Sequence, residues 1–158
     1  MKTARVLDLD PDLGNAITEA DLPRARDALV ARSYELPSGQ WEISEATEEN
    51  GAYGVLVTSG VLALRTSIAD RATLELVGPG DLLQPWVQLG AETSAPPAAG
   101  WEVLEQARVL LLDYGFAFAA AQWPQIGSAL MYRLVLRSRR LCYQLAVNTA
   151  PISSRPRT

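Results

Sequence analysis

The chain has 158 residues, a formal net charge of −4, no histidine and one cysteine. This length predicts one domain around one core, and the acidic balance argues against a nucleic-acid-binding surface over the whole domain. Without histidine, the usual zinc and non-haem iron ligand sets cannot be assembled, and neither can Ser-His-Asp or Cys-His catalytic groups. We therefore expect no metal, no cofactor and no enzyme activity.

The amino-terminal stretch and the lone Cys142 indicate the compartment. The first residues, MKTARVLDLDPDLGN, lack the apolar core of a signal peptide, and no segment has the roughly 18 consecutive apolar residues that span a bilayer. A single cysteine is typical of a reducing compartment and excludes an internal disulfide. The sequence thus predicts a cytoplasmic protein with no membrane contact.

The first half of the chain is predicted to hold a short helix followed by strands. Residues 1–14 are expected to be a loose lead-in, and apolar residues at helical spacing predict an amphipathic helix over 19–31, with Thr18 and Asp21 as a capping pair. Strand-forming residues then predict strands near 33–36, 41–43, 53–57, 61–65 and 72–77. Turn compositions separate them at Pro37-Ser38-Gly39, Ser59-Gly60, Asp70-Arg71 and Gly78-Pro79-Gly80-Asp81.

Two segments have the composition of surface loops. The acidic run over 45–51 is interpreted as solvated rather than as a cation site, and residues 90–100, GAETSAPPAAG, are expected to form a surface loop. The remaining elements are expected at 101–105 and 107–112, two strands split by a polar turn, and at 116–120, a short helix. Residues 15–123 therefore predict an antiparallel β-roll or jelly roll, in an α+β fold that is mainly β.

A long helix is predicted over 124–149, with Pro124 in the first turn, where its missing N–H needs no partner. The helix carries two apolar stripes, so one can pack on the roll while the other needs a partner. This predicts a homodimer formed through the helix, and the tail 150–158 is expected to fray. The residues assigned to the dimer interface are Leu130, Met131, Leu134, Val135, Ser138, Leu141, Cys142 and Leu145.

Other conspicuous side chains receive structural interpretations. The basic cluster of the long helix is expected to border the dimer seam or face solvent; it consists of Arg133, Arg137, Arg139 and Arg140. The tryptophans are interpreted as core or interface residues; they are Trp41, Trp86, Trp101 and Trp123. Cys142 is interpreted as a small buried apolar residue of the seam rather than as a redox sensor.

The order of a short helix, a β-roll and a long carboxy-terminal helix resembles the effector domains of the Crp/Fnr family of transcription regulators. The segment Gly78-Pro79-Gly80-Asp81-Leu82-Leu83 resembles the glycine-then-acid opening of the family's phosphate-binding cassette. Residues 107–113 resemble the last strand of the roll, and residues 134–145 resemble the dimerisation helix. The resemblance implies a cyclic-nucleotide-binding-like domain in transcription control, in which a ligand changes how two long helices cross.

In this resemblance the candidate ligand-binding residues are Gly78, Gly80, Asp81, Leu82 and Leu83. The amide groups after Gly80 would hold a phosphate and Asp81 would meet a ribose hydroxyl. In the alternative interpretation, which we favour, Gly78 and Gly80 supply the positive φ angles of a sharp strand corner that Asp81 fixes.

Two departures from the family pattern are visible. The family's phosphate-pairing arginine would fall near Pro97, and no basic residue lies between Arg71 and Arg108, so a phosphate would meet Asp81 and Glu92 without a cation. Cyclic nucleotide is therefore disfavoured. Ten residues follow Asn148, too few for a helix-turn-helix, so the chain is not expected to read DNA sequence by itself and could form heterodimers with a full-length regulator.

Two alternatives belong to other classes of protein. One is a small-molecule-binding β-roll of the cupin type, whose metal-binding members need histidines that this sequence lacks. The other is a structural interaction protein without any ligand.

Overall fold

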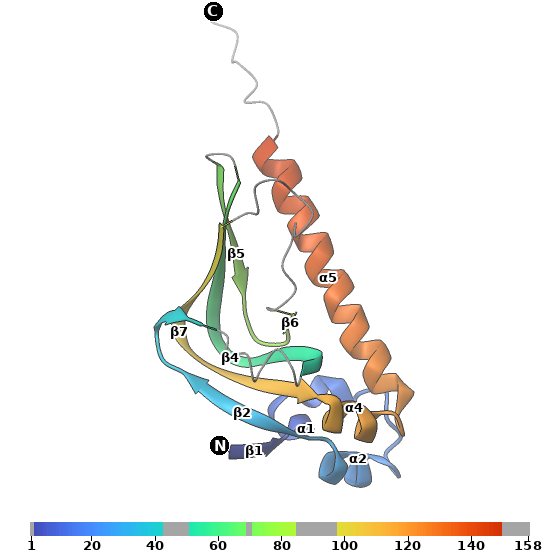
Figure 1. The fold of residues 1–158 in the computed structure, drawn as a ribbon. Coiled ribbons are helices and arrows are strands. Elements are labelled where there is room, and N and C mark those ends of the chain that lie inside the picture. The colour runs from blue at the N-terminus through green and yellow to red at the C-terminus, as the bar shows by residue number, and fades with distance from the viewer. Residues whose placement is uncertain (1, 43–50, 69–70, 85–97, 150–158) are drawn as a thin grey trace, which may run out of the picture.

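The structure is a computed structural model that describes residues 2–42, 51–68, 71–84 and 98–149 (Figure 1). Its elements in chain order are β1 Lys2–Arg5, α1 Val6–Leu9, the 3-10 helix η1 Pro11–Gly14, α2 Leu22–Ala28, β2 Val30–Leu36, β3 Gly39–Trp41, β4 Gly51–Ile68, β5 Arg71–Val77, β6 Leu82–Leu83, β7 Ala98–Asp113, α4 Tyr114–Ala120 and α5 Pro124–Thr149. Several predicted features lie outside the described residues, namely the acidic loop up to residue 50, Trp86, Glu92, the position near Pro97 and the tail 150–158.

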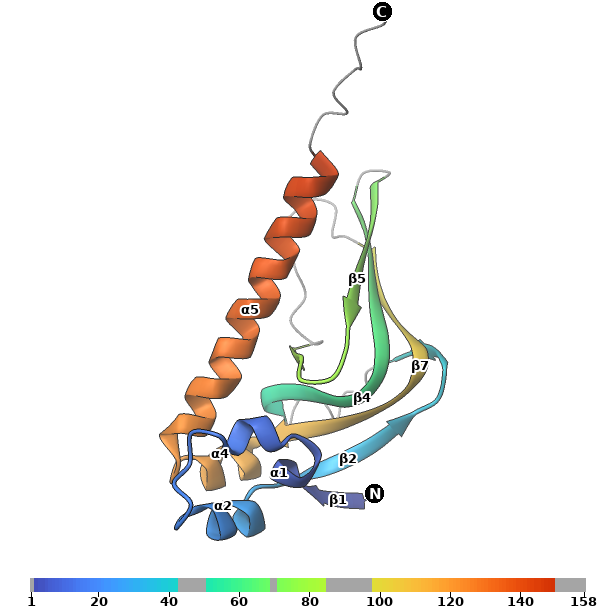
Figure 2. The same ribbon diagram turned by 180° about the vertical axis from the view of Figure 1, so that it is seen from behind.

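The described strands form one antiparallel sheet in the order β1-β2-β7-β4-β5, with β3 paired to β7 and β6 paired to β4. The long strands β4 and β7 pair over almost their whole length and curl together, while α1, α2 and α4 gather near the first turns of α5 (Figures 1 and 2). The fold is the strand-dominated β-roll with a long carboxy-terminal helix that the sequence predicts, and the predicted fold class is confirmed.

Two predicted turns within the long strands are bends instead. β4 continues through Ser59-Gly60 and β7 continues through Gln106, with shifts of register between Val57 and Leu62 that mark β-bulges. Gly60 has φ +82°, and a Cβ at this position would lie 2.4 Å from the carbonyl oxygen of Gln106. A bulge bends a strand without reversing it. Glycine and small polar residues occur in both bulges and turns, so composition alone predicted a turn where the strand has a bulge. Ala98–Gly100 likewise belong to β7 rather than to the predicted loop.

The expected loose lead-in is wrong for residues 2–14. β1 pairs with β2, and Val6 and Leu13 are completely buried. The predicted helix is shorter than expected, because α2 covers only Leu22–Ala28. Thr18 and Asp21 do pair before it: the Thr18 hydroxyl donates to the Asp21 carboxylate at 3.0 Å and accepts from the Asp21 amide at 3.3 Å.

The core has two parts on opposite faces of the long strands, because alternate residues of β4 and β7 serve each part. The first part joins the sheet to the helices and includes Val6, Leu13, Leu56, Leu82, Leu110, Leu112, Phe116, Ile126 and Leu130. The second consists of strand residues alone and includes Leu36, Val55, Val57, Leu62, Val77, Leu83, Val103, Val109 and Leu111. We call this second part the roll interior.

Candidate functional site

The corner between β5 and β6, residues 78–81, is closed by its own hydrogen bonds. The Gly78 amide donates to Asp81 Oδ2 at 3.0 Å, and the Asp81 amide donates to the Gly78 carbonyl at 3.1 Å. The Gly80 amide donates to the Val57 carbonyl at 2.8 Å. These three amides therefore have acceptors inside the fold, whereas a phosphate cradle would need its amides free.

The glycines of the corner differ in conformation. Gly80 has φ +87° and needs glycine, as predicted, but Gly78 does not have a positive φ, so this part of the prediction is wrong. The buried Asp81 side chain holds the turn together by accepting from the Gly78 amide. The corner thus has the geometry of the turn interpretation.

Three arginines of α5 reach this corner or the strands β5 and β6 beside it, and we call Arg133, Arg137 and Arg140 the arginine clamp. Arg133 pairs with Asp10, with Nη2 2.8 Å from Oδ1, and donates to the Gly80 carbonyl at 3.2 Å. Arg137 holds Glu75 through two bonds, Nε to Oε1 at 2.6 Å and Nη2 to Oε2 at 2.8 Å. It also donates to the Leu82 carbonyl at 3.5 Å, and Arg140 pairs with Asp81.

Two of the three clamp pairs are shielded from water. The side chains of Arg133 and Asp10 are 15% and 9% exposed, and those of Arg137 and Glu75 are 17% and 12% exposed, whereas Arg140 is 56% exposed. The hydrogen bonds that Arg133 donates to Asp10 raise the pKa of Arg133 above its ordinary value, although burial opposes the shift. The guanidinium groups of the clamp are therefore occupied by carboxylates of the same chain.

The interpretation of the basic cluster as a seam or a solvated face is wrong for Arg133 and Arg137, which are shielded in pairs with Asp10 and Glu75, whereas Arg140 is exposed. Spacings of four and three residues place Arg133, Arg137 and Arg140 on one face of α5, and Arg139 is exposed on another. This spacing was readable in the sequence. The acidic partners were not, since they lie 59 to 123 residues away along the chain.

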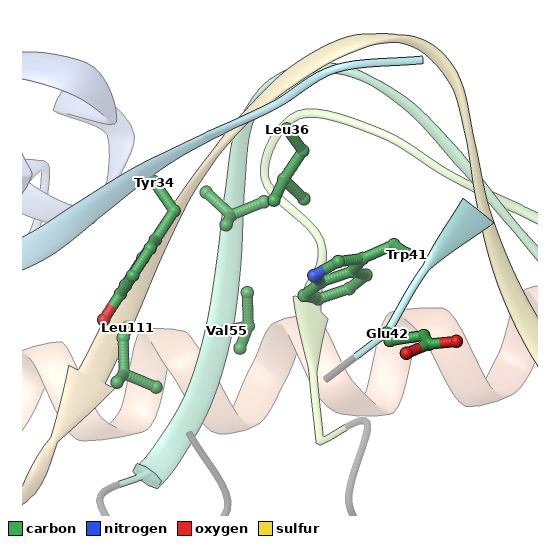
Figure 3. A pocket seen from close by; sticks show the side chains of 7 residues that line it. Tyr34, Leu36, Trp41, Glu42, Val55 and Leu111 are labelled. Atoms are coloured by element: carbon green, nitrogen blue, oxygen red, sulfur yellow. The ribbon is translucent and has the colours of Figure 1, made fainter. Parts of the chain in front are cut away.

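A cavity of about 180 Å³ lies in the roll interior, at the wall formed by β2, β4 and β7 (Figure 3). Tyr34 and Trp41 flank its aliphatic side chains from two sides (Figure 3). The described residues that line it are Tyr34, Leu36, Trp41, Glu42, Val55, Val109 and Leu111. None of these was predicted as a site residue. The one available signal in the sequence was the alternation along β4 and β7, which places Val55, Val109 and Leu111 on the face opposite the other core part.

The described lining of the cavity is apolar and aromatic, with one acid. Trp41 packs edge-on against Trp101, with ring centroids 6.0 Å apart and planes at 65°. Glu42 is exposed and carries the one charged side chain among the described lining residues. An anion placed here would lose its hydration against apolar walls and would face a carboxylate, and both effects are unfavourable.

The cavity and the corner are joined through β6. Val55, in the cavity wall, is paired with Leu83, and both are buried in the roll interior. The two strands approach so closely that a Cβ on Gly54 would lie 2.2 Å from the Leu83 carbonyl oxygen. Leu83 follows directly on Asp81 and Leu82, which the arginine clamp holds. One short strand therefore contacts the cavity wall on one side and α5 on the other.

The residues assigned to the dimer interface divide between two faces of α5. Leu130 is completely buried in the protomer's own core and Leu134 packs against that core, so Leu130 has no surface for a partner. Met131 and Val135 are 55% and 48% exposed, Ser138 and Cys142 are also exposed, and Leu141 is half-buried. The side chain of Leu145 lies outside the described part of the chain.

The exposed face of α5 also carries aromatic and aliphatic residues that the predicted set omitted. These are Tyr132, Leu136 and Tyr143, and they extend the apolar face on one side of the helix.

Among the helices that the structure describes, none combines the length and the apolar character that a membrane span requires.

The sequence matches no family model and no curated protein, whereas the structure matches solved proteins at the level of the fold. The Catabolite Activator Protein of Thermus thermophilus aligns with a TM-score of 0.54 at 20% identity, over 87% of this chain and 62% of that chain. A CooA mutant from Carboxydothermus hydrogenoformans aligns with a TM-score of 0.55 at 12% identity, over 90% of this chain and 88% of that chain.

A cyclic nucleotide-binding domain containing protein from Listeria monocytogenes EGD-e aligns with a TM-score of 0.54 at 16% identity, over 94% of this chain and 64% of that chain. The chain thus spans less than two thirds of the catabolite activator protein and of the Listeria protein. At the level of the fold, the resemblance stated from the sequence is confirmed: this chain has the cyclic-nucleotide-binding-like jelly roll found in regulators of the Crp/Fnr type.

Proposed function

We propose that this protein is the effector module of a transcription regulator, in which the roll receives a signal and α5 transmits it. The observation that carries the proposal is the arginine clamp, because it fastens the long helix to β5, to the corner and to β6, and β6 pairs with Val55 of the cavity wall. The structural likeness to a catabolite activator protein and to CooA supports a regulatory role. No step of this function requires a covalent reaction.

The proposed transmission runs through β6. A ligand that presses on Val55 would move its partner Leu83, and with it the corner that Arg137 and Arg140 hold. The helix would then shift relative to the roll. A ligand can drive such a change only if it binds the two positions of the helix with different affinity. In this proposal the clamp has two arrangements, one with the carboxylates paired, as in this structure, and one with them released.

Cyclic nucleotide is not the proposed signal. The amides of Gly78, Gly80 and Asp81 are used within the fold, and the described cavity lining holds no basic side chain. The arginines that lie near the corner are already paired with Asp10, Glu75 and Asp81. A cyclic phosphate would have to displace one of these carboxylates before it could be bound.

We further propose that α5 forms a dimer through its exposed apolar face. Burying this face against a second copy would remove apolar surface from water, which is the driving force for most association. The same face would serve a heterodimer with a longer regulator that carries a DNA-binding domain. A structural interaction protein without a ligand would share this dimer but would lack any response of α5 to the roll.

The single cysteine makes the test direct, because a nitroxide spin label on Cys142 marks one exposed position of α5. A dimer is expected to give one intermolecular spin–spin distance, which the Val135→Glu variant should abolish together with the dimer mass seen by light scattering. Leu74→Glu is the matched control, since Leu74 and Val135 are both 48% exposed. An unlabelled chain that is monomeric at all concentrations in light scattering would refute the dimer, and light scattering of the labelled chain checks that the label on Cys142, in the proposed interface, leaves the dimer intact.

Transmission is tested on the same labelled dimer. Arg137→Ala frees Glu75 and is expected to broaden or shift the distance distribution between the two labels, because α5 loses its fixed position on the roll. Arg139→Ala is the control, since Arg139 lies on the exposed side of the same helix. An unchanged distance in both variants would contradict the clamp as the link between roll and helix.

A further inference from the structure

We infer that the cavity in the roll interior binds a small aromatic molecule that is neutral or positively charged, and that it rejects aromatic carboxylates and phosphates. The inference rests on the proposed function in one respect, that the roll is the part that receives a signal. It names the chemical class of that signal from the size, the walls and the charge of the cavity.

The size of the cavity selects a ligand of one or two rings. An apolar protein cavity of about 150 Å³ holds a benzene molecule, and this cavity of about 180 Å³ is only slightly larger. A single ring with a short side chain or a fused pair of rings such as indole fits that volume. A complete nucleotide, with base, sugar and phosphate, exceeds it.

The walls of the cavity favour an aromatic body. Leu36, Val55 and Leu111 offer apolar contact, and Tyr34 and Trp41 lie on two sides of this group (Figure 3). Ring pairs of this kind prefer edge-to-face or offset contacts. The Trp41 ring already stands edge-on to Trp101, which holds it in place against the cavity. Little reorganisation is then needed when a ligand ring enters.

The charge at the cavity selects against anions. Glu42 is exposed beside Trp41, and no arginine or lysine is among the described lining residues. A ligand ammonium group would be attracted both by this carboxylate and by the faces of the flanking aromatic rings. A ligand carboxylate of the same length would meet like charge at the same place. A neutral ring would be indifferent to Glu42.

The test compares three small probes and one nucleotide by isothermal titration calorimetry on the intact chain. Indole and 2-phenylethylammonium are expected to bind, phenylacetate to bind about fivefold more weakly than 2-phenylethylammonium, and cyclic AMP not to bind. Glu42→Gln should remove most of the difference between the amine and the carboxylate while leaving indole unchanged. Because Glu42 is exposed, this variant should fold normally.

Two further variants place the binding in the cavity. Val55→Phe should fill the cavity and abolish binding of indole, whereas Leu104→Phe, on an exposed position of β7, should leave it unchanged. If Val55→Phe fails to fold, tryptophan fluorescence supplies the same information. In the wild-type chain, 2-phenylethylammonium is expected to quench this fluorescence, and in Trp41→Phe the quenching should be lost.

The outcomes separate this inference from the proposed function. Binding of neither indole nor the amine, or tighter binding of phenylacetate or cyclic AMP, overturns the ligand class, while the spin-labelled dimer and its dependence on Arg137 would still support the module. If the aromatic probes bind but α5 neither dimerises nor responds to Arg137→Ala, the ligand class is supported and the proposed function is refuted.

Discussion

The corner between β5 and β6 and the cavity in the roll interior lie on either side of one short strand, yet their chemistry is opposite. The corner is polar, its three amides are bonded within the fold, and arginines of α5 hold its buried acid and carbonyls. The cavity is lined by aliphatic and aromatic side chains with a single acid among the described residues. The polar groups therefore serve the attachment of the helix, and the ligand that we propose would be recognised mainly by apolar contact.

The corner resembles a phosphate cradle in its glycine and its acid, but its amides are bonded within the fold. Glycine at position 80 permits a positive φ, which a cradle and a tight turn both require. What decides between them is whether the amides have acceptors already. Here they do, and the neighbouring guanidinium groups are paired with carboxylates of the same chain.

The largest expected effect comes from Gly54, at the junction of the two regions. A Cβ there would lie 2.2 Å from the Leu83 carbonyl at a φ of +136°, so Gly54→Ala combines a backbone clash with backbone strain. We expect the free energy of unfolding in urea to fall by about 4 kcal/mol. Gly39→Ala has a similar φ of +128° but open space around the new Cβ, so it meets the backbone strain alone and should cost about 2 kcal/mol. Equal losses in the two variants would show that β6 does not press on β4.

Breaking the best-shielded pair of the clamp has the next largest effect. Arg133→Ala leaves Asp10 buried without its partner, and the free energy of unfolding is expected to fall by about 3 kcal/mol. Arg5→Ala is the control, because the Arg5–Asp27 pair is 52% and 69% exposed and should contribute less than about 1 kcal/mol. Denaturant unfolding measures the free energy of unfolding of both variants. If Arg133→Ala lowers it no more than Arg5→Ala does, the Arg133–Asp10 pair contributes no more than an ordinary surface ion pair.

Replacing the same residue by lysine gives a smaller, pH-dependent effect. The pKa of Arg133 is raised in the folded state, so its contribution is fully present below the unfolded value and is lost only as the pH rises through the still higher folded value. The stability that the pair contributes should thus be constant from about pH 7 to about pH 11. In Arg133→Lys the cation titrates within this range, and we expect a deficit that grows by roughly 1 kcal/mol toward the alkaline end.

That experiment compares unfolding free energies of the wild type and the lysine variant at each pH. A deficit that stays constant as the pH rises would mean that the charge of residue 133 does not support the fold. Arg26→Lys on the surface serves as the control, since its partner Asp8 lies in solvent-exposed surroundings.

The smallest expected effect on stability belongs to Arg140. Its side chain is 56% exposed, so Arg140→Ala should cost less than about 1 kcal/mol in denaturant unfolding. The corner should nevertheless loosen, because Asp81 loses a partner while it still accepts from the Gly78 amide. Amide hydrogen exchange at residues 78–82 is expected to rise in this variant, whereas exchange within α4 should not change. Unchanged exchange at the corner would restrict the working clamp to Arg133 and Arg137.

Periodicity in the sequence was enough to predict the class of fold, the long helix and the presence of an apolar face on it. Alternating strand formers predicted β4, β5 and β7, and the helical spacing after Pro124 predicted α5, because these patterns follow from side-chain direction along a strand or helix. The same patterns did not separate bends from turns at Gly60, or a packed amino terminus from a loose one.

The arrangement of charges and the cavity were decided only by the tertiary structure. Arg133, Arg137 and Arg140 share one helix face, and that much follows from their spacing. Their carboxylate partners are Asp10, just before η1, Glu75 of β5 and Asp81 of the corner. These contacts form only when distant parts of the chain pack together, and no local pattern encodes them. The cavity likewise arises from the curl of β2, β4 and β7 around one another. A sequence sets the direction of each side chain along its own element, whereas the partners of that side chain depend on the packing of all the elements.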